Sequence, residues 1–331
     1  MAETNVMLRK VIVIGAIDDA GTSLLKDRSD IEYEVVVDVS EENLCRVVHD
    51  AHGLLVRTAT ISPRVIASAL ELEVVSRHGV GYDSVDVESL TARSIPLALA
   101  VGSNAVSVAE QAMHLILTLT KQGFLYHEAV KDGQFDFRQR PSSSCLEGKS
   151  ILVIGFGRTG SRVGARASAF DMNLYAIDPY INPDIIRRAG GTVVTDLATA
   201  LPHMDVVTIH CPKTHETQNL IERTALDAMK TSAILINTAR GGIVNEMALV
   251  EALSSNQIAG AGIDVFESEP PDIDHPLLAL PNVVLSPHCA GVTRESLIQM
   301  ATIAAENILA AFDGTLQPEM VANTEVLPSP S

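Results

Sequence analysis

Cysteine, tryptophan and long apolar segments are the features that this sequence has least of. Its four cysteines are scattered and form neither a CxxC pair nor a zinc-ligand pattern, which argues against a disulfide framework or a structural zinc site. No uninterrupted apolar run reaches the roughly 20 residues that a membrane-spanning helix needs, and the opening MAETNVMLRK does not resemble a secretory signal. These absences predict a cytoplasmic protein with free thiols and no membrane partner.

Positive charge is also scarce. The 24 Lys and Arg residues against 41 Asp and Glu residues give a formal net charge of −17, which disfavours nucleic acid or an anionic membrane as a partner. An acidic protein that binds an anionic small molecule needs local positive groups, so single arginines become informative. The chain has 331 residues, 47% of them hydrophobic. Because single cores stop growing at about 250–300 residues, two folded domains are expected.

Apolar strand-like runs alternate with helical stretches along nearly the whole chain. A first series predicts strands at 10–14, 33–37, 53–56, 74–77 and 97–100. A second series predicts strands at 151–154, 173–177, 192–194, 206–210, 233–237, 260–264 and 283–285. Alternation of this kind predicts an α/β protein with parallel sheets, and two series predict two sheets.

Two long helices are expected at 104–122 and 293–312; in the first, apolar residues recur at three- and four-residue spacing. A chain that crosses between domains at both helices forms a discontinuous first domain, residues 1–104 plus 295–331. The second domain is then continuous, residues 105–294. An active-site cleft between two such bodies is expected.

The segment ILVIGFGRTG contains three glycines in G-x-G-x-x-G order directly after an apolar strand. Gly155 would make the tight turn, Gly157 would let the backbone approach a pyrophosphate, and Gly160 would let the helix pack on the strand. The helix N-terminus would add free N–H groups for the phosphates. A later strand ends on Asp178, whose carboxylate suits the ribose hydroxyls of NAD and repels a 2′-phosphate. An ordinary strand–turn–helix junction is the alternative, but strand, glycines and spaced acid together favour a dinucleotide site, with NAD preferred over NADP.

Three ionisable side chains follow the ends of later predicted strands: Arg240 in NTARGG, Glu269 in DVFESEP and His288 in SPHCAG. Because the carboxyl ends of parallel strands line one crevice, the three are expected to converge beside a nicotinamide. Hydride exchange with C2 of a 2-hydroxy acid needs an imidazole to carry the hydroxyl proton, a guanidinium to hold the carboxylate, and a group that orients the imidazole. His288, Arg240 and Glu269 fit these roles. Taken singly, the histidine would more often be structural and the arginine a solvated loop charge.

The sequence resembles the D-isomer-specific 2-hydroxyacid dehydrogenase family over essentially its whole length. The matching motifs are VRTAT (56–60), HGVGYDSVD (78–86), SVAEQ (107–111), GFGRTG (155–160), HCPKTHETQNLI (210–221), INTARGGIVNEMALVEAL (236–253), DVFESEP (264–270) and PHCAG (287–291). The resemblance implies two Rossmann-like or flavodoxin-like domains, of which the smaller, discontinuous one binds the substrate and the larger one binds NAD. It implies His288 as the proton donor in the reducing direction. It also implies a homodimer formed through the cofactor domains by the 104–122 helix and the loop after it.

The same resemblance assigns cofactor contacts around the glycine loop. Arg158 and Thr159 would meet the pyrophosphate, and Asp178 the adenosine ribose. The residues that would line the adenosine side are Cys211, Pro212 and Thr217. Those that would surround the nicotinamide are Thr238, Ala239, Asp264, Ala290 and Gly291.

In the first domain the family pattern places Arg57 and the backbone of His78, Gly79 and Val80 against the substrate. Glycines allow the amides of a tight loop to point at a carboxylate, although a plain glycine-rich turn is the alternative. In the phosphoglycerate dehydrogenase branch an arginine in this VR-S/T-AT motif helps to bind the substrate phosphate. His78 departs from that branch, where a small residue is more usual. This difference disfavours 3-phosphoglycerate without excluding it, and hydroxypyruvate, glyoxylate and other short 2-oxo acids are the other substrates to consider.

Other functions on the same scaffold are a phosphite dehydrogenase and a non-enzymatic NAD-sensing corepressor. Corepressors of this fold use an active-site tryptophan, which this sequence lacks, and formate dehydrogenases pair the histidine with Gln where Glu269 stands here. His210 and His215 suggest a metal pair, but no Cys or carboxylate spacing completes a site, so no metal is expected. Cys289 is next to His288, but hydride transfer needs no covalent intermediate, so this thiol is expected to pack.

Overall fold

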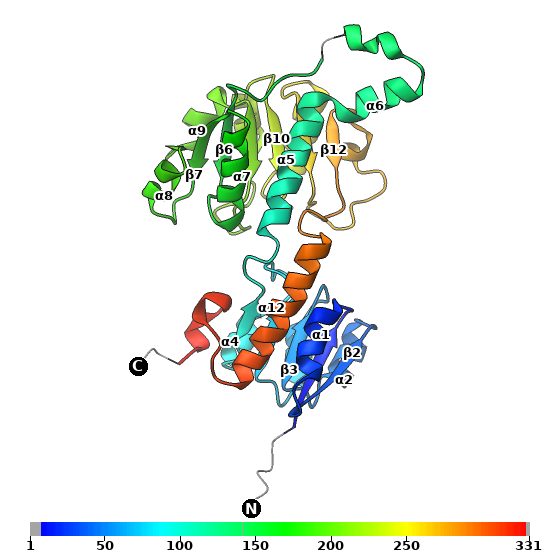
Figure 1. The fold of residues 1–331 in the computed structure, drawn as a ribbon, viewed down its shortest axis with the longest axis vertical. Helices are drawn as coiled ribbons and strands as arrows, with labels where there is room; N and C mark the ends of the chain where they lie inside the picture. The colour runs from blue at the N-terminus through cyan, green and yellow to red at the C-terminus, as the bar shows by residue number, and fades with distance from the viewer. Residues whose placement is uncertain (1–7, 141, 329–331) are drawn as a thin grey trace, which may run out of the picture. The chain divides into compact units, whose positions relative to one another are not determined.

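The computed structural model describes residues 8–140 and 142–328, which form two compact units (Figure 1). Unit 1 comprises the described parts of Met1–Asn104 and Val292–Ser331, and unit 2 comprises those of Ala105–Gly291. The chain passes between the units close to the two expected crossings at 104 and 294. Residues 1–7 and 329–331 of the expected first domain lie outside the described residues.

Unit 1 is built on a five-stranded sheet in which every pairing between named strands is parallel, with strand order β2-β1-β3-β4-β5. The strands are β1 (Arg9–Ile14), β2 (Ile31–Val36), β3 (Gly53–Val56), β4 (Val74–Arg77) and β5 (Leu97–Leu99). The helices are α1 (Asp19–Lys26), α2 (Glu41–Val47), α3 (Pro63–Ser68), α4 (Val87–Ala92) and α12 (Arg294–Phe312), with 3₁₀ turns η4 (Pro318–Met320) and η5 (Thr324–Val326). This strand order is the flavodoxin-like form of a doubly wound sheet.

Unit 2 is built on a seven-stranded parallel sheet with order β12-β11-β10-β9-β6-β7-β8, an extended Rossmann order. The strands are β6 (Ser150–Ile154), β7 (Asn173–Ile177), β8 (Thr192–Val193), β9 (Val206–Ile209), β10 (Ile234–Asn237), β11 (Gly260–Ile263) and β12 (Val283–Leu285). The helices are α5 (Ala105–Lys121), α6 (Gly123–Lys131), α7 (Arg158–Ala169), α8 (Pro183–Arg188), α9 (Leu197–Ala200), α10 (Arg223–Ala228) and α11 (Glu246–Ser254). Three 3₁₀ turns complete it: η1 (Phe135–Gln139), η2 (Leu201–His203) and η3 (Pro276–Ala279).

Most strands of both sheets are apolar along most of their length, and helices cover both faces of each sheet. In β6, Ile151 and Val153 pack in one core with α5 and α7, whereas Leu152 and Ile154 pack in another core with α10 and α11. Successive side chains of a strand point to opposite faces, so a continuously apolar strand requires helices on both sides. The β1 strand divides in the same way, with Ile12 and Ile14 in one core of unit 1 and its valines in the other.

Helix α5 covers one face of the unit 2 sheet (Figure 1) and approaches β11 closely. A Cβ placed on Gly262 would lie 2.9 Å from the Leu115 Cβ, so this approach needs a glycine in the strand. All twelve expected strands are present, with ends within two residues of those predicted, and the two expected long helices are α5 and α12. The prediction of an α/β protein with two parallel sheets is confirmed.

Neither α6 nor η1 is expected from the sequence. Helix α6 carries only one buried residue, Ala129, while its larger apolar side chains Phe124, Leu125 and Val130 are exposed. A helix without a core-facing stripe gives no periodic signal to read. Within the described residues, none of the helices combines the length and apolarity that crossing a membrane would take.

Candidate active site

The glycine loop between β6 and α7 has the geometry that its glycines require. Gly155 adopts a φ of +86°, and a Cβ there would lie 2.6 Å from the Cys211 backbone nitrogen. A Cβ on Gly160 would collide with the Gly155 carbonyl oxygen. The first glycine therefore makes the turn and the third lets α7 pack against it, as the sequence predicts.

Gly157, the N-cap of α7, faces open space. It is exposed, and a Cβ placed on it would meet no heavy atom within 4 Å. In the first turn of α7, Arg158 is exposed and Thr159 is half-buried. A 12-residue helix with no capping side chain leaves its first N–H groups and the positive end of its dipole for an anion. This cradle fits the pyrophosphate of a dinucleotide.

Asp178, directly after β7, is tied to the glycine loop. Its Oδ2 accepts the Phe156 N–H at 2.8 Å and its Oδ1 accepts the Tyr180 N–H at 3.0 Å. Each carboxylate oxygen can accept a second hydrogen bond, so the fixed carboxylate keeps acceptor capacity for ribose hydroxyls. The sequence predicts this residue for the ribose, and the structure places it beside the loop.

The loop after β9 contains the residues expected on the adenosine side. Thr217 Oγ1 donates to the Pro212 carbonyl at 2.7 Å and accepts the Thr214 N–H at 2.7 Å, which folds the loop on itself. Burial raises the pKa of the Cys211 thiol to about 11, so this thiol stays protonated at neutral pH.

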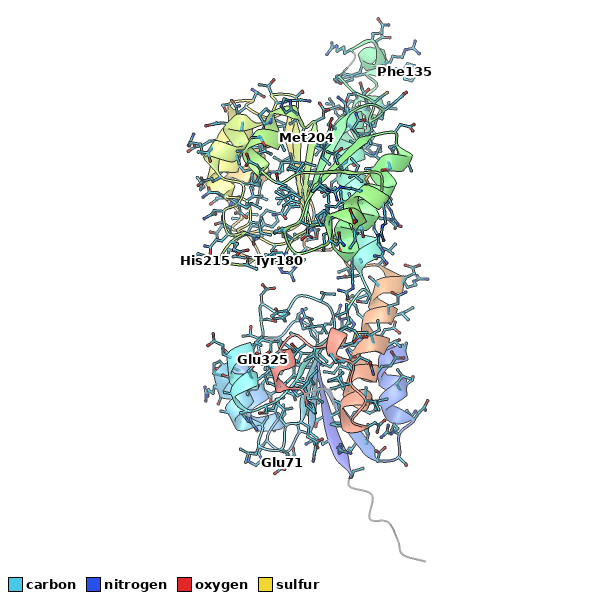
Figure 2. All side chains as sticks on the ribbon, turned by 90° about the vertical axis from the view of Figure 1, so that its left-hand side faces the viewer. Glu71, Phe135, Tyr180, Met204, His215 and Glu325 are labelled. Carbon is cyan, nitrogen blue, oxygen red and sulfur yellow. The ribbon has the colours of Figure 1, made fainter. Side chains whose placement is uncertain are left out.

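The same loop reaches the segment after Asp178. The Tyr180 hydroxyl donates to the Glu216 carboxylate, and Figure 2 shows Tyr180 and His215 at one edge of unit 2. The Glu216 carboxylate, with a smaller contribution from Asp178, raises the pKa of Tyr180. Two carboxylates therefore lie close to this tyrosine.

The turn that carries Arg240 is shaped by Asn237, the last residue of β10. The Asn237 Oδ1 accepts the Ala239 N–H at 3.1 Å, and its Nδ2 donates to the Arg240 carbonyl at 2.9 Å. The Arg240 Nη1 donates to the Ala239 carbonyl at 2.7 Å. Thr238 is buried, and its Oγ1 has no hydrogen-bond partner among the described residues. An orphaned buried hydroxyl here is consistent with a ligand polar group at this turn.

Asp264, directly after β11, holds the loop that follows β12. Its side chain is fully buried and accepts hydrogen bonds from the Ser286 hydroxyl at 2.5 Å, the Cys289 N–H at 3.0 Å and the Ala290 N–H at 2.9 Å. The Asp264 carbonyl also accepts the His288 N–H at 2.8 Å. These bonds hold His288 at a φ of +50°, a conformation that few residues other than glycine adopt.

His288 and Glu269 are brought together. The His288 Nδ1 lies 2.6 Å from the Glu269 Oε2, and the other carboxylate oxygen accepts the Phe266 N–H at 3.0 Å. A carboxylate partner favours the proton on Nδ1, since only an N–H can donate to it. Nε2 is then the nitrogen that exchanges protons. Cys289 beside it is held by its backbone, and burial raises the pKa of its thiol.

Arg240, Glu269 and His288 follow β10, β11 and β12, which are neighbours in the sheet. The glycine loop follows β6, two strands from β10, and the direction of the sheet winding changes between β6 and β9. Ligands of doubly wound sheets bind at the carboxyl edge near such a switch point. Unit 2 therefore presents the expected cofactor and acid–base groups along one sheet edge.

The expected substrate residues lie in unit 1, after β3 and β4. The Arg57 Nη1 donates to the Ala16 carbonyl at 2.7 Å. The Arg77 guanidinium donates to the His78 carbonyl at 2.8 Å and to the Arg57 carbonyl, which joins the two strand ends. Gly79 adopts a φ of +137°, a value that favours glycine.

His78 is buried, with 4% of its surface exposed, whereas Val80 is exposed. Burial, with a smaller contribution from the Arg57 charge, lowers the pKa of His78 to about 4, so the ring is neutral at pH 7. The Nε2 atom of His78 has no hydrogen-bond partner within the described part of the chain. The ring therefore lies inside unit 1, and the His78 N–H donates to the Val56 carbonyl at 2.8 Å.

His210 and His215 form no metal site with other residues. In residues 8–140 and 142–328, no group of three or more His, Cys, Asp and Glu side chains has an arrangement that would hold a metal ion. His210 instead pairs through Nε2 with the Thr208 hydroxyl at 2.8 Å, and burial lowers the pKa of its ring to about 3.

Comparisons with known proteins agree with this architecture. Residues 113–290 match the family model described as "D-isomer specific 2-hydroxyacid dehydrogenase, NAD binding domain". D-3-phosphoglycerate dehydrogenase of Archaeoglobus fulgidus is 38% identical over 306 residues, covering 92% of this chain and 58% of that protein. Glyoxylate reductase of Thermofilum pendens is 38% identical over 324 residues, covering 96% of this chain and 95% of that protein. The crystal structure of TT0316 protein from Thermus thermophilus has a TM-score of 0.84 at 31% identity, covering 95% and 99% of the two chains.

Two doubly wound parallel sheets, one of which carries a glycine loop and a strand-end acid, define a two-domain dinucleotide-binding protein. The chain belongs to the D-isomer specific 2-hydroxyacid dehydrogenase family, and its residues 113–290 contain the NAD binding domain of that family. The expected family, the expected fold class and the expected cofactor NAD are thereby confirmed. The chain spans 58% of the length of the Archaeoglobus relative.

Asn237 and Ser286 shape the site but are not expected from the sequence. The sequence gives a weak signal for Asn237, because it is a polar residue at the end of an apolar strand. The structure shows that its side chain is buried, with 2% of its surface exposed. The sequence gives no signal for Ser286, because its partner Asp264 is 22 residues away and on another strand end.

The open space around Gly157 leads to a prediction for cofactor binding. Gly157→Ala should fold with an unchanged thermal unfolding midpoint and bind NADH at least about tenfold (~1.4 kcal/mol) more weakly, because the added methyl occupies the phosphate cradle. NADH fluorescence titration and thermal unfolding measure the two quantities. As a control, Gly160→Ala should unfold at a lower temperature, because its methyl collides with the Gly155 carbonyl. Unchanged NADH affinity in Gly157→Ala would show that the cradle is not the phosphate site.

Proposed function

We propose that this protein is an NAD-dependent oxidoreductase that transfers a hydride between nicotinamide and C2 of a small 2-hydroxy or 2-oxo acid. The observation that carries the proposal is the 2.6 Å pair of His288 and Glu269 within an NAD binding domain. An imidazole oriented by a carboxylate is a proton carrier suited to a hydroxyl at C2. The names of the two relatives, D-3-phosphoglycerate dehydrogenase and glyoxylate reductase, support the same class.

The glycine loop and Asp178 would hold NAD, which supplies or accepts the hydride when bound. In the reducing direction His288 gives the proton on Nε2 to the C2 oxygen, while Nδ1 stays bonded to Glu269. The carboxylate of Glu269 keeps the ring in one tautomer and one orientation throughout. The Arg240 guanidinium binds the substrate carboxylate through paired N–H groups, which fixes the position of C2. In the oxidising direction the same histidine takes the hydroxyl proton.

We assign further substrate contacts to unit 1, as the substrate domain. Arg57 and the amides of His78, Gly79 and Val80 follow the neighbouring strands β3 and β4. The φ of +137° at Gly79 and the guanidinium of Arg77 across both strand ends support a preformed loop. The His78 and Gly79 N–H groups donate to the Val56 and Arg77 carbonyls at 2.8 Å, so an anion would meet the Val80 N–H and the Arg57 guanidinium.

Reduction assays test the proposed function directly. Purified protein should oxidise NADH with one or more of hydroxypyruvate, glyoxylate, pyruvate and 3-phosphohydroxypyruvate, followed by the loss of NADH absorbance. Preference for the phosphorylated acid would identify Arg57 as a phosphate ligand. Preference for an unphosphorylated acid would identify a short-chain 2-oxo acid reductase. Tight NADH binding without turnover of any acid would contradict the proposal and favour phosphite oxidation or a corepressor-like scaffold.

His288→Asn is the matched mutant for this assay. It should lower kcat by about 10²–10⁴-fold, because the general acid is lost, while NADH affinity stays unchanged. His203→Asn, an exposed histidine in η2, should retain wild-type activity. Near-wild-type turnover by His288→Asn would remove this residue from the mechanism.

We propose that NAD is preferred over NADP because of Asp178. A 2′-phosphate at the ribose would meet the negative charge of the Asp178 carboxylate. A second carboxylate, that of Glu216, is hydrogen-bonded to Tyr180 in the same segment. Asp178→Ser combined with Pro179→Arg should increase kcat/KM for NADPH relative to NADH by at least about tenfold, because a like charge is replaced by an opposite one. Steady-state kinetics with both cofactors measure this ratio. Equal use of the two cofactors by the wild-type protein would contradict this reading of Asp178.

We propose that the protein forms a homodimer through the segment 123–139, here called the arm, which contains α6 and η1. Phe124, Val130 and Phe135 in the arm are 61–62% exposed, and the last two line an apolar groove of about 290 Å³. The arm extends beyond the sheet of unit 2, with Phe135 towards its far end (Figures 1 and 2). A cluster of exposed apolar side chains of this kind marks an interface, and a second copy would bring an identical arm to cover it.

Sedimentation tests the dimer. The wild-type protein should sediment at twice its mass of 35.3 kDa. Phe124→Asp with Val130→Asp should convert it to the monomer, because two charges enter the apolar interface. Ile185→Asp, an exposed apolar residue of α8, should leave the mass unchanged. A monomeric wild-type protein would contradict the proposed interface.

We also propose that the protein acts in the cytoplasm. All four cysteines are free in the structure, which agrees with a reducing compartment. The net charge of −17 supports a small-molecule substrate rather than nucleic acid as its partner.

A further inference from the structure

Three ionisable side chains outside the expected site connect the loop that carries Glu269 to α11 and η3: Glu267 belongs to the loop, Glu246 begins α11 and His275 precedes η3. Glu246, the first residue of α11, is buried, and its Oε1 accepts the Glu267 N–H at 2.6 Å. The Glu267 carboxylate in turn accepts the Glu246 N–H at 3.3 Å. The Glu246 Oε2 lies 3.0 Å from the His275 Nε2. We call Glu246, Glu267 and His275 the brace.

The hydrogen bonds of His275 fix its tautomer. Its Nδ1 accepts the Leu277 N–H at 3.3 Å, so the ring proton is on Nε2 and is donated to Glu246. Burial, with a smaller contribution from the Glu267 charge, raises the pKa of Glu246, whereas the Glu267 N–H and His275 oppose this shift. The Glu246 carboxylate is therefore removed from water but satisfied by two donors, one from each side of the loop.

The brace joins the two segments that carry Arg240 and Glu269. Helix α11 begins with Glu246, shortly after the turn that contains Arg240. A Cβ on Gly241 would collide with the Phe266 carbonyl, so the Glu269 loop rests directly on that turn. Phe266 directly precedes Glu267, and its N–H donates the hydrogen bond that holds the Glu269 carboxylate.

We infer that Glu246 is a positioning residue that clamps the 266–269 loop onto the turn after Arg240 and thereby holds the Glu269 carboxylate against His288. The inference rests on the proposed function, because it adds a residue to the same acid–base site. Glu246 does not contact His288 directly. It is connected to His288 by successive hydrogen bonds that involve Glu267, Phe266 and Glu269.

Glu246→Gln tests the clamp with almost no change in volume. If the Gln oxygen keeps the Glu267 N–H, its NH₂ group meets the Nε2–H of His275, donor against donor. Moving the ring proton to Nδ1 instead places it against the Leu277 N–H. Turning the amide over would relieve the clash with His275 only by placing its NH₂ group against the Glu267 N–H, so one hydrogen bond, to Glu267, His275 or Leu277, is lost in every arrangement. The 266–269 loop is then held less firmly, and kcat for reduction should fall about tenfold while the Kd for NADH stays within twofold.

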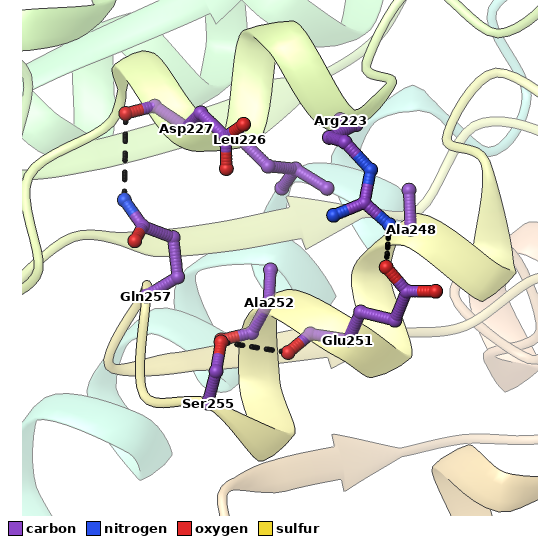
Figure 3. Close-up of a pocket in the computed structure, with 8 residues that line it drawn as sticks. All are labelled: Arg223, Leu226, Asp227, Ala248, Glu251, Ala252, Ser255 and Gln257. Carbon is purple, nitrogen blue, oxygen red and sulfur yellow. Dashed lines mark hydrogen bonds and ion pairs between the residues drawn. The ribbon is translucent and has the colours of Figure 1, made fainter.

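Glu251→Gln is the matched control on the same helix. Glu251 is exposed and pairs with Arg223 at a surface pocket of about 260 Å³ whose lining residues include no member of the brace (Figure 3). This variant should keep wild-type kcat. Loss of activity in both variants to the same extent would overturn the positioning role, because general weakening of α11 would then explain it.

A double-mutant cycle separates positioning from stability. In the Glu269→Ala background, Glu246→Gln should lower kcat no further, because the group that it positions is absent. Additive losses would overturn the inference, since Glu246 would then act independently of Glu269.

A third measurement needs no substrate. The proton in the His288–Glu269 hydrogen bond should give a downfield imidazole resonance in NMR, assigned by its loss in His288→Asn. Glu246→Gln should shift or broaden this resonance and Glu251→Gln should not. An unchanged resonance in Glu246→Gln would overturn the inference. A shifted resonance in a protein that reduces none of the tested acids would support the clamp while the proposed function fails.

Discussion

The interaction on which the site most depends is that between the Asp264 carboxylate and the loop after β12. A carboxylate that is fully buried is stable only when hydrogen bonds replace its hydration. Ser286, Cys289 and Ala290 supply three donors, and satisfying them fixes the path of the loop. The position and the positive φ of His288 follow from that path.

The same arrangement recurs along the carboxyl edge of the unit 2 sheet. Asp178 accepts the amides of Phe156 and Tyr180, and Glu269 accepts the amide of Phe266. Where parallel strands end, loop amides lose their ladder partners and need other acceptors. Acidic side chains at the strand ends meet that need and connect each loop to another. The acidic groups along this edge thus support the loops that follow the strands.

How much could be read from the sequence depends on whether the cause was local. The strands follow from apolar runs, and α5 and α12 from long helical patterns, so all were predicted to within a few residues. The roles of Gly155 and Gly160 in the turn were readable for the same reason, since a positive φ and a close helix approach exclude a side chain. Helix α6 was missed because most of its apolar residues face outward and leave no core pattern.

The sequence by itself determined the two parallel sheets, the glycine loop and the strand-end residues Arg240, Glu269 and His288, because each depends on nearby residues or on a family motif. Only the tertiary structure decided which side chains support them. Asp264 meets Ser286 across 22 residues, and Glu246 meets His275 from another helix end. Such contacts depend on strand order and on which buried groups still need partners. Neither the strand order nor the partners of buried polar groups can be read from the periodicity of the chain. The supporting roles of these residues are therefore apparent only in the tertiary structure.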